Sequence, residues 1–198
     1  MKERHVTLLV LALLFVAVAL SAADNATIMP SDDEDIGYGS VPCPQLWYKR
    51  GSLSSPYIVG KGNQFDHRYR LAVRLPLDTL LAYGKVEQAT FRFKVQMYPG
   101  DRESRSYLLE ILNEDIMKLK ANDLSSPDVL PLARLELGRA DVGKTIKVDV
   151  TEAVQHALDE VWSSLVIRFR PIPEDEPNDD SGASGLAVEL SSLRLTSR

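Results

Sequence analysis

The feature that most constrains this chain is an alternation of apolar and polar residues with a period of two. In residues 68–75, Tyr69, Leu71, Val73 and Leu75 point to one side and Arg68, Arg70, Ala72 and Arg74 to the other. The same period recurs in 90–97, 106–112, 133–137, 146–150, 165–169, 186–190 and 193–195. These segments are separated by Gly, Pro, Asn and Asp. The pattern predicts about eight short strands in an all-β fold, an antiparallel jelly-roll-like β-sandwich.

One segment departs from this period. Val150, Val154, Ala157, Leu158 and Val161 recur at helical spacing, which predicts a short amphipathic helix over about 150–161. Asp149 or Thr151 is expected to cap its first turn. The helix should lie across an open end of the sandwich. A second helical turn is expected around 114–120.

The first 23 residues read as a secretory signal peptide. A short basic start precedes an apolar run from Leu8 to Leu20, and Ser21-Ala22-Ala23 offers a cleavage site. An uncleaved membrane anchor is the alternative, but the run is shorter than the roughly 20 residues that a spanning helix needs. We therefore expect a secreted or extracellular protein, with the periplasm and the cell surface also open.

The remaining chain divides into two parts. Residues 24–44 are acidic, rich in turn formers and without an apolar period, so we expect a flexible leader there. Residues 45–198 would form the sandwich domain. Cys43 is the only cysteine, which excludes an intrachain disulfide. Asn25 begins a glycosylation sequon, which has meaning only in a eukaryotic host.

Composition and spacing argue against several functions. Lys and Arg total 23 against 28 Asp and Glu, and no basic block is present, so nucleic acid is not an expected partner. Neither His67 nor His156 has a second His or Cys at metal-ligand spacing, and no nucleophile motif is complete. We expect a protein that is not an enzyme and has no cofactor.

Two acidic runs are candidate cation sites. Calcium prefers several carboxylate oxygens, and Glu174, Asp175, Asp179 and Asp180 lie in one loop between two expected strands. The spacing does not fit an EF-hand, so a solvated charge run is the preferred interpretation. The same interpretation applies to Asp32-Asp33-Glu34-Asp35.

Aromatic and basic residues suggest where a sugar would bind. Aromatic rings stack on the apolar faces of sugars, and guanidinium groups pair with their acidic groups. The candidate carbohydrate-binding residues are Trp47, Tyr48, Tyr57, Arg68, Arg70 and Arg74, the arginines being expected on an exposed sheet face. The alternative is that Trp47 fills the core and the arginines only solvate the sheet.

These segments also resemble a known family. Residues 146–158 followed by 165–169 resemble the "DVT…V" segment of DNRLRE domains, the disaggregatase-related carbohydrate-binding modules of secreted microbial proteins. Residues 68–77 with 84–93, and 185–192, are similar to other parts of that family's pattern. The family's Trp- and Glu-containing stretch is missing between Leu112 and Arg139. Transforming-growth-factor propeptides share a similar Asp-Val-Thr signature, which implies at most a common architecture.

The resemblance implies a secreted, non-catalytic module that binds an extracellular polysaccharide, acidic in view of the three arginines. The alternative is a protein-interaction or matrix-assembly scaffold of the same fold without a sugar site. Exposed aromatic residues on one sheet face would favour the first function. A long unpaired edge strand or an apolar patch would favour the second.

Overall fold

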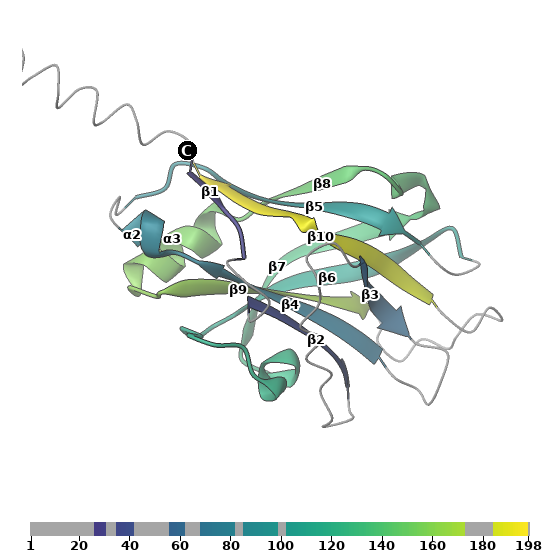
Figure 1. Cartoon of the computed structure of the whole chain (residues 1–198), viewed down its shortest axis with the longest axis horizontal. Helices are drawn as coiled ribbons and strands as arrows, with labels where there is room; N and C mark the ends of the chain where they lie inside the picture. The colour runs from purple at the N-terminus through teal and green to yellow at the C-terminus, as the bar shows by residue number, and fades with distance from the viewer. Residues whose placement is uncertain are drawn as a thin grey trace, which may run out of the picture.

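The computed structural model describes residues 26–30, 35–41, 56–61, 68–81, 85–98, 102–172 and 184–197. These residues form two antiparallel sheets that pack together, as Figure 1 shows. The first sheet has the order β2 (Ile36–Val41), β4 (Arg68–Pro76), β9 (Ser164–Ile172), β6 (Ser104–Leu112) and β7 (Val129–Gly138). The second contains β10 (Ser184–Ser197), β5 (Ala89–Met97) and β8 (Thr145–Asp149). The predicted all-β sandwich is therefore confirmed at the level of its two layers.

Two further strands join these layers at their margins. β3 (Pro56–Lys61) pairs along its length with β10 and, at Gly60 and Lys61, with β4. β1 (Ala26–Ile28) pairs with the last residues of β10. The helical segments are α2 (Asp78–Leu81), η2 (Ala121–Ser125), η3 (Arg139–Asp141) and α3 (Thr151–Asp159).

Aromatic side chains fill the space between the sheets. Phe91 and Phe93 from β5 meet Phe169 from β9, and all three are fully buried. The rings of Phe93 and Phe169 lie 5.0 Å apart, edge to face. On β4, Leu71, Val73 and Leu75 face this core with no exposed surface. The period of two thus assigned the inward face of these strands correctly.

α3 closes one end of the sandwich (Figure 1). Val154 and Ala157 are fully buried against the core, as the helical spacing predicted. The Asp149 carboxylate accepts hydrogen bonds from the Thr151 backbone N–H at 2.9 Å and from its hydroxyl at 2.6 Å. This satisfies a donor that the first turn of a helix leaves without an intrahelical partner.

The structure corrects the expected leader. Residues 26–28 and 36–41 are strands, and Ile28 and Ile36 are buried in the core. The folded domain therefore includes residues before the predicted boundary at 45, and residues 24–44 are not all a flexible leader. Gly37, Gly39 and the acidic neighbours hide the strand period there.

Three other expectations differ from the structure. The expected strands 186–190 and 193–195 are parts of one long strand, β10. The expected helical turn around 114–120 is absent, and the turn lies instead at η2. β3 was not predicted, because Gly60 and the polar neighbours weaken its apolar pattern.

A second small core lies on the outer face of the five-stranded sheet. Residues 113–128, which we call the strap, cross that face and include η2. Ile116, Leu119 and Leu124 of the strap pack against Ala72 of β4 and Val166 of β9. The strap therefore covers the face that bears the outward side chains of β4.

Candidate functional site

The structure does not bring the six expected sugar-binding residues together as a described surface. Trp47 and Tyr48 lie outside the described residues. Tyr57 lies in β3 opposite Val188, and Arg68 begins β4 opposite Lys61 and Val41, but for both only the backbone is described. Only Arg70 and Arg74 have described side chains.

Arg70 and Arg74 hold the strap to the sheet. The Arg70 guanidinium donates to the Leu124 carbonyl at 2.6 Å, and the Arg74 Nε donates to the Ile116 carbonyl at 2.8 Å. Arg74 also forms an ion pair with Asp35 at 2.6 Å, in which the Asp35 side chain is only 3% exposed. The expectation of freely exposed arginines is therefore wrong for these two, as is the expectation that Asp35 belongs to a solvated run.

A buried ion cluster continues along the same face. Arg168 donates to the carbonyls of Asp123, Leu124 and Ser126 of the strap, at 3.1, 3.2 and 2.9 Å. Its second nitrogen pairs with Glu110 at 3.1 Å, and Arg170 also pairs with Glu110. Burial lowers the pKa of Arg168 from its ordinary value, and the charge of Glu110 opposes this effect. The charged groups of Arg168, Arg170 and Glu110 are therefore paired with groups of the protein itself.

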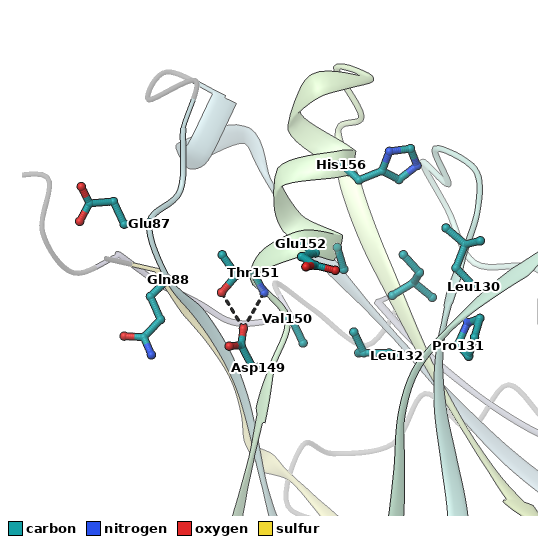
Figure 2. Close-up of a pocket in the computed structure, with 12 residues that line it drawn as sticks. Glu87, Gln88, Leu130, Pro131, Leu132, Asp149, Val150, Thr151, Glu152 and His156 are labelled. Atoms are coloured by element: carbon teal, nitrogen blue, oxygen red, sulfur yellow. Dashed lines mark hydrogen bonds between the residues drawn. The ribbon is translucent and has the colours of Figure 1, made fainter.

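A pocket of about 1010 Å³ lies beside α3, where the two sheets diverge (Figure 2). Glu87 and Gln88, just before β5, stand on one side, and Leu130, Pro131 and Leu132 of β7 stand on the other. The first turn of α3 lies between them. The lining residues are Glu87, Gln88, Ile111, Leu130, Pro131, Leu132, Asp149, Val150, Thr151, Glu152, Ala153 and His156.

The pocket is apolar on the β7 side and acidic on the other. Glu87, Asp149 and Glu152 contribute carboxylates, and none of the described lining residues is Lys or Arg. Hydrogen bonds from the Thr151 hydroxyl and backbone N–H lower the pKa of Asp149, so this carboxylate is ionised at neutral pH. The pocket therefore offers a negative rim beside an apolar wall.

Long-range hydrogen bonds hold the acidic side of the pocket to α3. The backbone N–H of Ala89 donates to the Thr151 hydroxyl at 2.9 Å, and that of Val86 donates to the Gln155 side-chain oxygen at 2.9 Å. Both bonds join the entry of β5 to α3. The acidic side of the pocket is preformed rather than dependent on a ligand.

His156 lies at the top of the pocket but is held by neighbours. Its ring packs edge to face on Trp162 with 5.2 Å between centroids, and its Nε2 lies 3.4 Å from the Asn113 side-chain oxygen. Trp162 itself packs against the main core. His156 therefore shapes the pocket wall.

β7 is an edge strand. Within the described residues it pairs with β6 alone, and its apolar side chains are incompletely covered. Leu130 is 41% exposed, and Leu132 and Leu135 are half-buried against the core. Sequence reasoning placed this strand at 133–137 and missed 129–132, because Pro131 interrupts the alternation. The apolar wall of the pocket comes from that missed part.

The remaining predicted sites are not described. Glu174, Asp175, Asp179 and Asp180, proposed for calcium, lie outside the described residues, as do Cys43 and Asn25. Among the residues that are described, no three His, Cys, Asp or Glu side chains gather as a metal site. No helix in this part of the chain has the length and apolar character needed to cross a membrane.

Comparison with known proteins gives no assignment. No protein-family model matches the chain, and the search of curated proteins finds no match.

Proposed function

We propose that this chain is an exported, non-catalytic sandwich module that binds a segment of another extracellular protein in the pocket beside α3. The observation that carries the proposal is the pairing of an apolar wall, formed by β7, with a carboxylate rim at Glu87, Asp149 and Glu152. Such a pocket suits a ligand with apolar and basic side chains close together.

Electrostatics favour a protein segment with basic side chains over the alternative ligand, an acidic polysaccharide. A polyanion would meet like charge at the pocket rim, and none of the described lining residues is a Trp, Tyr or Phe on which a sugar could stack. Arg70 and Arg74, the expected anion-binding groups, are committed to the strap and to Asp35. These observations favour the protein-interaction function over polysaccharide binding.

The proposal keeps three predictions from the sequence. The apolar run before residue 24 supports export. The proposal also includes jelly-roll connectivity as the finer description of the two-layer fold. The segments 68–77 with 84–93, and 146–158 with 165–169, are the support for proposing membership of the DNRLRE class.

Fluorescence anisotropy with defined probes tests the ligand class. One labelled peptide alternates Leu with Lys, and a second peptide of equal length alternates Leu with Glu. We expect the basic peptide to bind and the acidic one not to bind, with affinity falling as salt rises, because the Debye length is about 8 Å at physiological ionic strength. Polygalacturonate serves as an anionic polysaccharide probe.

Variants locate the binding site. Glu87→Lys and Glu152→Lys should weaken binding of the basic peptide about tenfold each, which corresponds to about 1.4 kcal/mol. Glu160→Lys, an exposed change just after the same helix and outside the pocket, should leave affinity unchanged. Binding of polygalacturonate but not of the basic peptide would contradict this proposal and favour the sugar-binding function. Equal effects of all three variants would reject this pocket as the site.

A further inference from the structure

One edge of β7 has no partner among the described strands, and Pro131 limits how much of that edge can pair regularly. Pro131 has no N–H to donate and sits at an irregularity in the pairing of β7 with β6, between Leu109 and Glu110. Leu132 is the extra residue at this irregularity, and β7 pairs regularly with β6 from Ala133 to Gly138. Regular pairing with another strand is therefore confined to residues 133–138, a segment that contains Leu135.

The charges on this edge have a self-complementary order. Arg134 and Glu136 flank Leu135, and both side chains are exposed. When two identical strands pair antiparallel about a two-fold axis through Leu135, Arg134 of each copy lies opposite Glu136 of the other. Opposite charges directly across a strand pair stabilise it, and like charges destabilise it.

The same charges disfavour the neighbouring registers. A two-fold axis through residue 134 sets Arg134 against Arg134 of the other copy. An axis through residue 136 sets Glu136 against Glu136. All three of these registers keep the same side chains on each face of the sheet. The register centred on Leu135 makes two ion pairs, whereas the registers centred on residues 134 and 136 each make a like-charge contact.

Hydrogen bonds already hold these two side chains on one face. The Glu136 carboxylate accepts from the hydroxyls of Ser104 and Ser106 at 2.9 and 2.6 Å, and Arg134 donates to Ser106 at 3.1 Å. Arg134 and Glu136 are therefore already held in position on the outer face before a second copy binds. On the opposite face Leu135 is half-buried, so pairing with its counterpart would cover apolar surface.

We propose that two copies of this chain associate through their β7 edges, antiparallel about a two-fold axis at Leu135. The two five-stranded sheets then form one continuous sheet across the dimer. The interface uses residues 133–138, whereas the β7 residues that line the pocket are Leu130, Pro131 and Leu132. The proposal does not depend on the function assigned to the pocket.

Sedimentation equilibrium of the chain purified from a secretion host tests the association. We expect a concentration-dependent monomer–dimer equilibrium. Arg134→Glu sets carboxylates against each other across the axis, and Glu136→Arg sets guanidinium groups against each other. Each single change should raise the dimer dissociation constant about tenfold. The double variant Arg134→Glu/Glu136→Arg restores both ion pairs and should dimerise nearly as the parent does.

Lys147→Glu is the matched control, since it reverses an exposed charge on β8, the edge strand of the other sheet. It should leave dimerisation unchanged. Melting curves check that each variant is folded. A parent that stays monomeric at every concentration would overturn the proposal. A dimer that ignores both single changes, or that the double change does not restore, would overturn it as well.

Discussion

Val161, just after α3, has the backbone conformation that glycine usually takes. Its φ is +57°, and its side chain is 73% exposed. The backbone N–H of Trp162 donates to the Ala157 carbonyl at 2.8 Å, and that of Val161 donates to the Leu158 carbonyl at 3.0 Å. These bonds form a left-handed helix ending in which a β-branched side chain is strained.

Val161→Gly should therefore stabilise the protein by about 0.5 to 1 kcal/mol. Relief of about 1 to 2 kcal/mol of left-handed strain exceeds the extra chain entropy that glycine brings to the unfolded state. Thermal unfolding should show a melting temperature about 2 °C higher or more. Val142→Gly is the control, because Val142 is also exposed but has φ −58°. It should be neutral or destabilising, and stabilisation by both changes would show that strain is not the cause.

Asp149 gives the protein a predictable response to acid. Its pKa is lowered by hydrogen bonds from Thr151, so the folded state favours the ionised carboxylate. This contribution to stability is present above the unfolded pKa of about 3.9 and is lost as pH falls through the lower folded value. Urea unfolding between pH 5 and pH 2.5 should show a shallower loss of stability in Asp149→Asn than in the parent. Asp159→Asn, at the other end of α3, is the comparison, and an unchanged slope in Asp149→Asn would contradict the assignment.

At the scale of single elements, α3 depends on its buried face. Val154→Asp should destabilise the protein by about 2 to 4 kcal/mol, because Val154 is fully buried and the new carboxylate would have no partner there. Gln155→Asp should cause a smaller loss of about 1 kcal/mol, since the shorter side chain cannot keep the bond to Val86. Chemical denaturation measures both. Equal losses would mean that the helix is rotated from the described orientation.

The strap depends on its arginine anchors. Arg74→Ala should destabilise the protein by about 3 kcal/mol, because the buried Asp35 would lose its ion pair with Arg74 and the Ile116 carbonyl of the strap would lose its hydrogen bond. Asp35→Ala alone should also destabilise it. The double variant should lose less than the sum of the two single losses, a difference measured by a double-mutant cycle in urea. Additive losses would show that the two side chains do not act together.

The strap also shows where sequence reasoning reaches its limit. The period of two placed Arg70 and Arg74 on the outward face of β4, and that placement is confirmed. The outward face of a strand is exposed to water only where no other segment of the chain crosses it. Within residues 113–128 the sequence predicted only a helical turn around 114–120, and that prediction did not indicate that the carbonyls of this segment meet these guanidinium groups.

For the whole molecule, the two-layer fold was predictable because burial on one face imposes the same period on long strands such as β4 and β5. The core phenylalanines follow that rule. The pocket was not predictable, since it is formed by residues from separate elements, among them Glu87, Leu132 and Glu152, that meet only through the packing of the sheets. Ile28 was missed because β1 has only three residues, and Ile36 because Gly37 and Gly39 interrupt the pattern of β2. Both strands are stabilised by tertiary contacts rather than by a local pattern.

The pairing of β1 with β10 determines when this fold can form. Ala26 lies opposite Ser197 and Ile28 opposite Leu195, while β10 also supplies partners for β3 and β5. Proteins dominated by such distant contacts fold in about milliseconds to seconds rather than microseconds, because long loops must close before the contacts form. A chain that is synthesised from its N-terminal side cannot complete the three-stranded sheet until β10 has appeared. The pairings of β1 and β3 with β10 therefore form late, after more than a hundred residues of intervening chain have been made.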